Sequence, residues 1–137
     1  MTTRLYHLFT DGASTGNPGQ AGIGAVVYTN DGRKVRETGR EIGRATNNVA
    51  EYTALIAGLT EVLALGGRRV KCFLDSELVV RQLNGSYRVR DTQLRVLNSL
   101  VRHVMTLFES TEFHHVPRTE NREADRLASS AARGKRR

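Results

Sequence analysis

The sequence predicts an α/β domain whose mixed five-stranded sheet has helices on its faces. Two observations indicate this class: short apolar runs ending in turn residues alternate with segments of helical spacing, and strands recur after helices. We expect strands at residues 5–10, 21–29, 34–42, 70–74 and 112–116, and helices around residues 52–63, 76–83, 94–108 and 124–131. The element order is therefore βββαβααβα.

The first three strands should form an antiparallel meander. The apolar run at residues 5–10 stops at Asp11-Gly12, and the run AGIGAVVYT at 21–29 leads into Asn30-Asp31-Gly32. Residues of this kind are typical of a tight hairpin turn, because they tolerate the backbone angles that such turns require. The third strand should therefore return beside the second.

The chain then changes to a helical period. Apolar residues share one stripe in two segments: Tyr52, Ile56, Leu59 and Leu63, then Leu94, Leu97, Val101, Val104 and Phe108. Gly66-Gly67 should end the first helix, and Asp91 or Thr92 should cap the start of the longer one. The strand at 70–74 follows a helix, so we expect it to run parallel to an earlier strand.

Composition limits the class of protein further. A chain of 137 residues with 39% hydrophobic and 26% charged residues fits one globular domain and excludes wholesale disorder. No apolar run approaches the roughly 18 residues of a membrane span. Cys72 is the single cysteine, which excludes an internal disulfide framework and a cysteine-cluster zinc site. The N-terminus lacks a signal core, so a cytoplasmic protein is expected.

The net charge of +7 and the pI near 10.3 suggest a polyanionic partner, with nucleic acid ahead of an anionic membrane. The alternative is a soluble protein that happens to be basic. Basic residues are dispersed, which favours a folded basic face over a disordered arm. We expect a catalytic domain at residues 1–133 and a basic tail at 134–137.

Four carboxylates stand out by position. Asp11 follows an apolar strand and precedes a glycine-rich stretch, Glu51 lies early in the first helix, Asp75 ends the fourth strand, and Asp125 lies one turn into the last helix. Strand ends and helix starts meet at one edge of an α/β sheet. Four acids there repel one another unless a cation lies between them, and oxygen ligands suit Mg²⁺ or Mn²⁺ better than zinc.

Each acid also has a purely structural interpretation. Asp11-Gly12 fits a turn, Asn48-x-x-Glu51 matches a capping box, Asp75-Ser76 resembles a helix N-cap, and Asp125 fits a solvated helix residue. For any one acid the structural interpretation is the commoner one. Four such coincidences in one chain favour a shared site, although spacing alone does not name a reaction.

Four motifs contain these acids. They are Phe9-Thr10-Asp11-Gly12-Ala13-Ser14 with Gly16-Asn17-Pro18-Gly19, Thr46-Asn47-Asn48-Val49-Ala50-Glu51-Tyr52, Asp75-Ser76 with Gln82-Leu83, and Asn121-x-x-Ala124-Asp125-x-Leu127-Ala128. In this order they resemble the signatures of ribonuclease H, type 1, across essentially the whole chain. The resemblance implies a ribonuclease H-like fold, in agreement with the element order.

The resemblance implies an endonuclease that hydrolyses the RNA strand of an RNA/DNA hybrid and leaves a 5′-phosphate and a 3′-hydroxyl. Asp11, Glu51, Asp75 and Asp125 would hold two Mg²⁺ ions, with Asp11 bridging both and Mn²⁺ as a substitute. No side-chain nucleophile is then required. The residues implied to contact substrate are Gly12, Ser14, Asn17, Thr46, Asn47, Asn48 and Gln82, with Thr46 and Asn17 at a phosphate of the DNA strand.

The sequence departs from the best-known bacterial members of that family in two places. The basic handle between the two central helices is missing, and Arg81, Arg88, Arg90 and Arg95 are expected to replace it in part. The loop after the fifth strand is shorter than the family's histidine-bearing loop.

His114 and His115 precede Val116-Pro117 and should belong to the fifth strand. Arg118 is then the residue left in the loop for the auxiliary catalytic role, where it would act electrostatically. Two alternatives to a hybrid-specific enzyme stay open: broader activity that includes double-stranded RNA, and a non-catalytic module that binds nucleic acid. We expect a monomer that does not bind membranes.

Overall fold

The computed structural model describes residues 4–134, and the predicted strands and helices are all present in the predicted order. The strands are β1 (Leu5–Ser14), β2 (Gly19–Thr29), β3 (Lys34–Ala45), β4 (Arg69–Leu74) and β5 (Ser110–His115). The helices are α1 (Asn47–Ala64), α2 (Glu77–Leu83), α3 (Thr92–Met105) and α4 (Arg122–Ala132), with a 3₁₀ turn, η1, at Arg118–Glu120. Residues 135–137 of the expected basic tail lie outside the described part.

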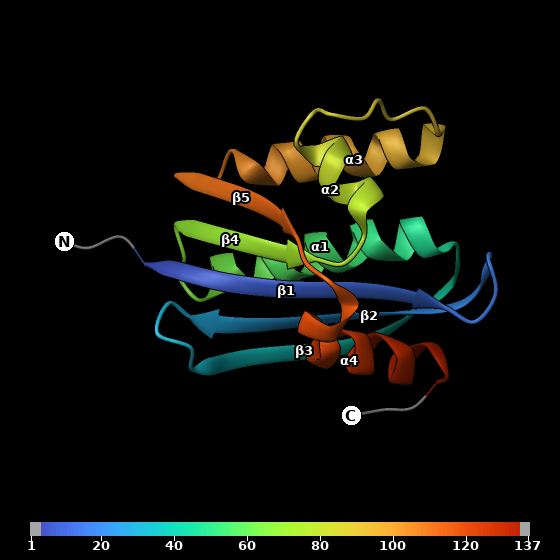
Figure 1. Ribbon diagram of the computed structural model, residues 1–137, viewed down its shortest axis with the longest axis horizontal. Coiled ribbons are helices and arrows are strands. Elements are labelled where there is room, and N and C mark those ends of the chain that lie inside the picture. The colour runs from blue at the N-terminus through green and yellow to red at the C-terminus, as the bar shows by residue number, and fades with distance from the viewer. Residues whose placement is uncertain (1–3, 135–137) are drawn as a thin grey trace.

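The five strands form one mixed sheet in the order β3-β2-β1-β4-β5. The β1–β2 and β2–β3 pairs are antiparallel, which confirms the meander, and the β1–β4 and β4–β5 pairs are parallel. The central strand β1 therefore has a parallel neighbour on one side and an antiparallel neighbour on the other. Figure 1 shows α1 behind this sheet and α4 in front of β2 and β3.

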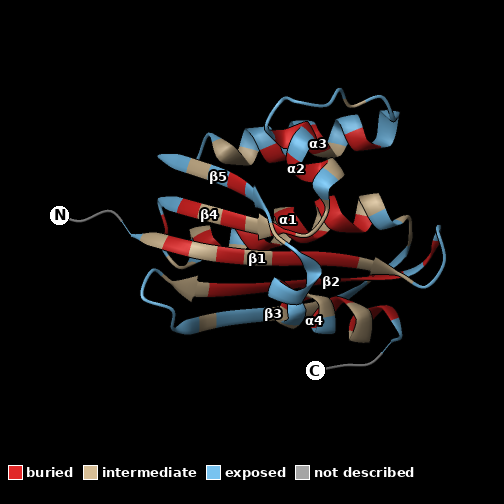
Figure 2. Ribbon diagram, in the orientation of Figure 1, coloured by how far each residue is buried: buried red, intermediate tan, exposed pale blue. Residues whose placement is uncertain are grey.

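The main core lies between the sheet and the α1–α3 layer. Leu8, Leu55, Leu59, Val70 and Val101 are among its fully buried side chains. In Figure 2 buried residues run along the central strands and along the inner faces of the helices, while the outer strands β3 and β5 are largely exposed. No helix of the described part is long and apolar enough to cross a membrane.

Helix α4 approaches the other face of the sheet closely because β2 carries glycine there. A Cβ atom built on Gly22 or Gly24 would overlap the backbone of α4. The small residues Ala124, Ala128 and Ala131 on the inner face of α4 complete this contact and are fully buried or nearly so. Glycine and alanine at this contact thus bring the helix that carries Asp125 close to the sheet.

Candidate functional site

Three carboxylates meet where β1, α1 and the end of β4 come together. Each of Asp11, Glu51 and Asp75 offers an oxygen, and these three oxygens lie within 4.8 Å of one another. Asp125 of α4 lines the same cavity of about 500 Å³, and its carboxyl group hydrogen-bonds with that of Asp11. The structure therefore brings together all four acids that the sequence singled out.

Burial and mutual repulsion govern the ionisation of this cluster. Burial, with the negative charges of Glu51 and Asp75 acting in the same direction, raises the pKa of Asp11 from 3.8 to about 10. Burial likewise raises the pKa of Glu51 to about 8, although a hydrogen bond from Asp11 favours its ionised form. Without a cation, Asp11 thus keeps a proton that it shares with Glu51.

The donor set fits a divalent cation of the Mg²⁺ or Mn²⁺ type. The three side chains whose oxygens lie within 4.8 Å of one another are all carboxylates, whose oxygens are the preferred ligands of these hard ions. Two of them, Asp11 and Glu51, are only 2% and 8% exposed, so water cannot neutralise their repulsion. A bound cation would relieve the repulsion that otherwise holds a proton in the cluster.

Strand β1 extends beyond its predicted end, and this extension places Asp11. The sequence suggested a turn at Asp11-Gly12, but the strand continues to Ser14 because Asp11 and Gly12 pair with Gly24 and Ile23 of β2. A Cβ on Gly12 would overlap the backbone of α1 at Ala50 and Glu51. Instead, the Gly12 N–H donates a 3.3 Å hydrogen bond to Glu51 Oε1.

The structural interpretations of Glu51 and Asp75 are wrong. Thr46, not Asn48, is the N-cap of α1, and its side chain accepts from the Val49 N–H, so Glu51 lies beyond a capping position. Ser76, not Asp75, caps α2 through its hydroxyl. Neither carboxylate therefore caps a helix, and both line the cavity.

Asn121 orients Asp75 and was not singled out from the sequence. Its side chain is 1% exposed, and its Nδ2 donates to the Thr10 carbonyl (2.9 Å) and to Asp75 Oδ2 (3.3 Å). On the opposite wall, Ser129 Oγ donates to Asp125 Oδ1 (3.4 Å). The motif that contains Asp125 also contains Asn121, but sequence spacing does not reveal that this amide points inward.

Most residues implied to contact substrate surround the start of α1. Gly12, Ser14 and Asn47 line the carboxylate cavity, and a neighbouring cavity of about 180 Å³ is lined by Asn17, Thr46 and Asn48. Hydrogen bonds join the two groups: the Asn47 N–H donates to Asn17 Oδ1 (3.0 Å), and the Ser14 N–H donates to Asn47 Oδ1 (3.1 Å). The start of α1 thus has a polar, ordered surface beside the acids.

Gln82 does not belong to this surface, and its assignment to substrate binding is corrected. Only 5% of the residue is exposed, and its Oε1 accepts a 2.7 Å hydrogen bond from the Tyr52 hydroxyl. It lies on the inward side of α2, where the helical period places it beside the buried Val79 and Leu83. Gln82 is a core residue whose polar group bonds within the protein.

Arg118 lies at the cavity, and the two histidines lie in β5, as the sequence predicted. Arg118 lines the carboxylate cavity from η1, and its positive charge offsets a small part of the rise that burial causes in the pKa of Glu51. His114 is exposed, contacts Glu112 Oε1 at 2.8 Å and stacks on Phe73. His115 is the last residue of the strand and is exposed too.

The arginines expected to replace the basic handle are all exposed. Arg81 is already engaged, because its Nε lies 2.9 Å from Glu77 Oε2 and its guanidinium lies over the Tyr87 ring. Arg88 and Arg90 lie in the connection between α2 and α3, and Arg95 lies in the first turn of α3. These three remain the better candidates for contacts with a polyanion.

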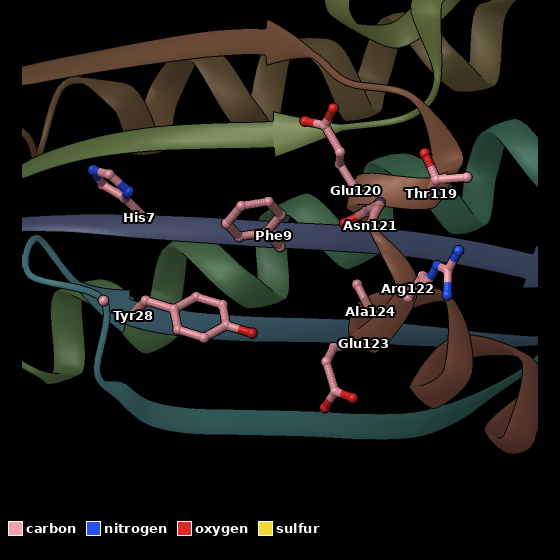
Figure 3. A pocket seen from close by; sticks show the side chains of 10 residues that line it. His7, Phe9, Tyr28, Thr119, Glu120, Asn121, Arg122, Glu123 and Ala124 are labelled. Carbon is pink, nitrogen blue, oxygen red and sulfur yellow. The ribbon is translucent and has the colours of Figure 1, made fainter.

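A second hollow lies on the other side of η1 and has a different character. Its volume is about 400 Å³, and Figure 3 shows the rings of His7, Phe9 and Tyr28 on its sheet side and residues 119–124 along its rim. Phe9 stacks on Phe73 at 4.7 Å between ring centroids and meets Tyr28 edge to face. An aromatic floor with scattered polar groups lacks the converging carboxylates of the first cavity.

The chain is similar to known proteins over most of its length. The family model described as "Reverse transcriptase-like" matches residues 9–131. The RNase H1 of the halophilic archaeon Halobacterium salinarum has a solved structure that is 43% identical, with a TM-score of 0.93 over 95% of this chain and 98% of that chain. The chain belongs to the ribonuclease H, type 1, family.

Two further relatives place this ribonuclease H chain in context. LC11-RNase H1, solved in complex with an RNA/DNA hybrid, is 36% identical with a TM-score of 0.90, covering 94% of this chain and 97% of that one. A bifunctional protein of Mycobacterium tuberculosis is 46% identical over 88% of this chain. The chain spans only 34% of the length of that curated relative.

Proposed function

We propose that this chain is a metal-dependent endonuclease that hydrolyses the RNA strand of RNA/DNA hybrids and leaves 5′-phosphate and 3′-hydroxyl ends. The observation that carries the proposal is the cluster of four carboxylates: oxygens of Asp11, Glu51 and Asp75 lie within 4.8 Å of one another, and Asp125 lines the cavity beside them. Membership of the ribonuclease H, type 1, family supports it, since one member of that family has been solved with a hybrid. All four carboxylates come from one chain, so a monomer suffices to form the site.

The four carboxylates would hold two Mg²⁺ ions, with Mn²⁺ as a substitute, and Asp11 would contribute to both. When bound, the two ions would supply an activated water and stabilise the leaving 3′-oxygen. The protein's own part is positional. Gly12 lets α1 approach β1, Asn121 and Ser129 orient two of the acids, and the buried floor excludes bulk water.

Contacts with the hybrid would come from the polar surface at the start of α1. Gly12, Ser14 and Asn47 lie beside the carboxylates, where 2′-hydroxyls of the RNA strand would be read. Asn17 and Thr46 lie in the adjoining cavity and would hold a phosphate of the DNA strand. Arg118 faces the carboxylates and would stabilise negative charge that develops at the cleaved phosphate.

We also propose that residues 1–133 form one catalytic domain and that the basic tail at 134–137 adds only weak phosphate contacts. The family match over residues 9–131 supports the first part. The net charge of +7 supports binding to a polyanion, mostly through dispersed arginines. Such contacts release counterions. The logarithm of the binding constant should therefore fall by about 0.9 for each tenfold rise in salt concentration, per neutralised phosphate on a duplex.

The test is incubation with end-labelled RNA/DNA hybrid, double-stranded RNA and duplex DNA, each with Mg²⁺, Mn²⁺ or EDTA. We expect cleavage of the RNA strand of the hybrid with either metal and no cleavage in EDTA. The matched control is Asp11→Asn, which keeps the shape of the side chain and removes its charge. Equal cleavage of double-stranded RNA would indicate the broader activity, and hybrid binding without cleavage under every condition would indicate a non-catalytic module.

A further inference from the structure

A chain of hydrogen bonds joins α1, α2 and α3. The Tyr52 hydroxyl donates to Gln82 Oε1 (2.7 Å), and Asn98 Nδ2 donates to the Tyr52 hydroxyl (3.1 Å). Arg102 Nε donates to Asn98 Oδ1 (2.9 Å). Tyr52, Gln82 and Asn98 are 0%, 5% and 8% exposed, so the two bonds of the Tyr52 hydroxyl form away from water, where each is strong and where an unmade bond is costly.

The same arginine also holds the end of α2. Arg102 Nη2 donates to the backbone carbonyls of Gln82 (3.2 Å) and Leu83 (3.3 Å), the last two residues of the helix. A positive charge at a helix C-terminus complements the partial negative charge of the unpaired carbonyls. Arg102 therefore joins α3 to α2 by its side chain and to α1 through Asn98 and Tyr52.

These bonds connect the two segments that carry Glu51 and Asp75. Tyr52 directly follows Glu51 in α1, and α2 begins at Glu77, immediately after Asp75 and its N-cap Ser76. Helix α2 has only seven residues, too few to hold its own orientation in water. Its direction must therefore come from packing and from the bonds at its two ends.

We infer that Tyr52, Gln82, Asn98 and Arg102 are positioning residues that fix Glu51 and Asp75 at the separation needed to bind a divalent cation. They act through α1 and α2 and touch neither cation nor substrate. The inference rests on the proposed function only in giving the cation a catalytic purpose. It requires that a variant lacking these bonds binds the cation more weakly than a variant that is equally destabilised at another position.

The test is calorimetric titration of Mg²⁺ into the folded protein without nucleic acid, together with thermal unfolding in EDTA. Two variants loosen the bonds. Tyr52→Phe removes the central hydroxyl, and Arg102→Gln changes an exposed residue and removes the guanidinium that bonds to Asn98 and to the end of α2. We expect each to bind Mg²⁺ about tenfold more weakly, the low end of the loss seen when the outer partners of metal ligands are removed. The matched control is Val62→Ala, a fully buried position near the far end of α1, which should lower the melting temperature and leave Mg²⁺ affinity unchanged.

Mg²⁺ affinities equal to wild type in both variants would overturn the inference. So would an equal weakening in Val62→Ala at a matched loss of melting temperature, because the effect would then follow from stability alone. If Tyr52→Phe does not fold, Arg102→Gln decides, since the change lies at the surface. A wild-type protein that binds Mg²⁺ but does not cleave hybrid would contradict the proposed function. The Mg²⁺ affinities of the variants would still test this inference.

Discussion

Replacing Asp11 by asparagine should stabilise the cation-free protein, and by more as the pH rises. Burial and the neighbouring carboxylates together raise the pKa of Asp11 from 3.8 to about 10, so between these values the folded protein keeps a proton that the unfolded chain releases. The folded state then binds more protons than the unfolded state, and its stability falls as pH increases. Asparagine has no such proton, so the variant escapes this loss.

The size of this stability difference follows from the pH range over which the folded protein holds the extra proton. One extra bound proton costs about 1.4 kcal/mol of stability per pH unit, so the advantage of Asp11→Asn should grow by about 3 kcal/mol between pH 5 and pH 7. The assay is urea unfolding in EDTA at pH 5, 6 and 7, with Asp31→Asn as a control at a surface carboxyl whose pKa is lowered by a hydrogen bond with Thr29. The Asp31 variant should show no such growth.

Addition of Mg²⁺ should reverse the order of stability at pH 7, because the cation takes the place of the proton in the wild-type protein. A stability difference between wild type and Asp11→Asn that stays constant from pH 5 to pH 7 in EDTA would contradict the raised pKa of Asp11. Asp11 would then ionise normally despite its burial, and repulsion among the acids would not be the force that a cation relieves.

Substitutions at three other places test the geometry of the site. Gly12→Ala should destabilise the protein by about 1–3 kcal/mol, measured by urea unfolding, because the new methyl group overlaps the backbone of α1; unchanged stability would place α1 farther from β1. Arg118→Ala should lower the turnover of hybrid about tenfold, less than the loss of an aligned oxyanion donor, whereas His114→Ala and His115→Ala should have little effect; the reverse result in steady-state kinetics would move the auxiliary role to the strand. Asn121→Ala should cost about 1–3 kcal/mol, because the buried Thr10 carbonyl loses its donor, and it should weaken Mg²⁺ binding in a calorimetric titration; unchanged Mg²⁺ affinity would mean that Asp75 keeps its orientation without the amide.

The sequence was sufficient to predict the element order and the meeting of the four acids. The stripe that includes Tyr52, Leu59 and Leu63 predicted α1, and strand ends beside helix starts predicted one edge for the carboxylates. These features depend on local periodicity and on general rules of α/β topology. Both leave a clear pattern along the chain.

What the sequence did not reveal depends on pairing across the fold. The strand at residues 5–10 was predicted to stop at Asp11-Gly12, but β2 supplies partners as far as Ser14. Gln82 resembled a substrate contact, yet its side chain meets the Tyr52 hydroxyl in the core. The role of Asn121 depends on the Thr10 carbonyl, which lies more than a hundred residues away along the chain. No local pattern carries this information.

The central position of β1 also bears on how the protein folds. Asp11 lies on a strand whose two neighbours are β2 and β4, and its partner acids come from α1, the end of β4 and α4. These segments span nearly the whole chain, so no short piece of it can assemble the cluster ahead of the rest. Distant segments pair slowly, because the intervening chain must be ordered first. Capture of a divalent cation would therefore mark the completion of folding, and a cation-dependent signal could time its last step.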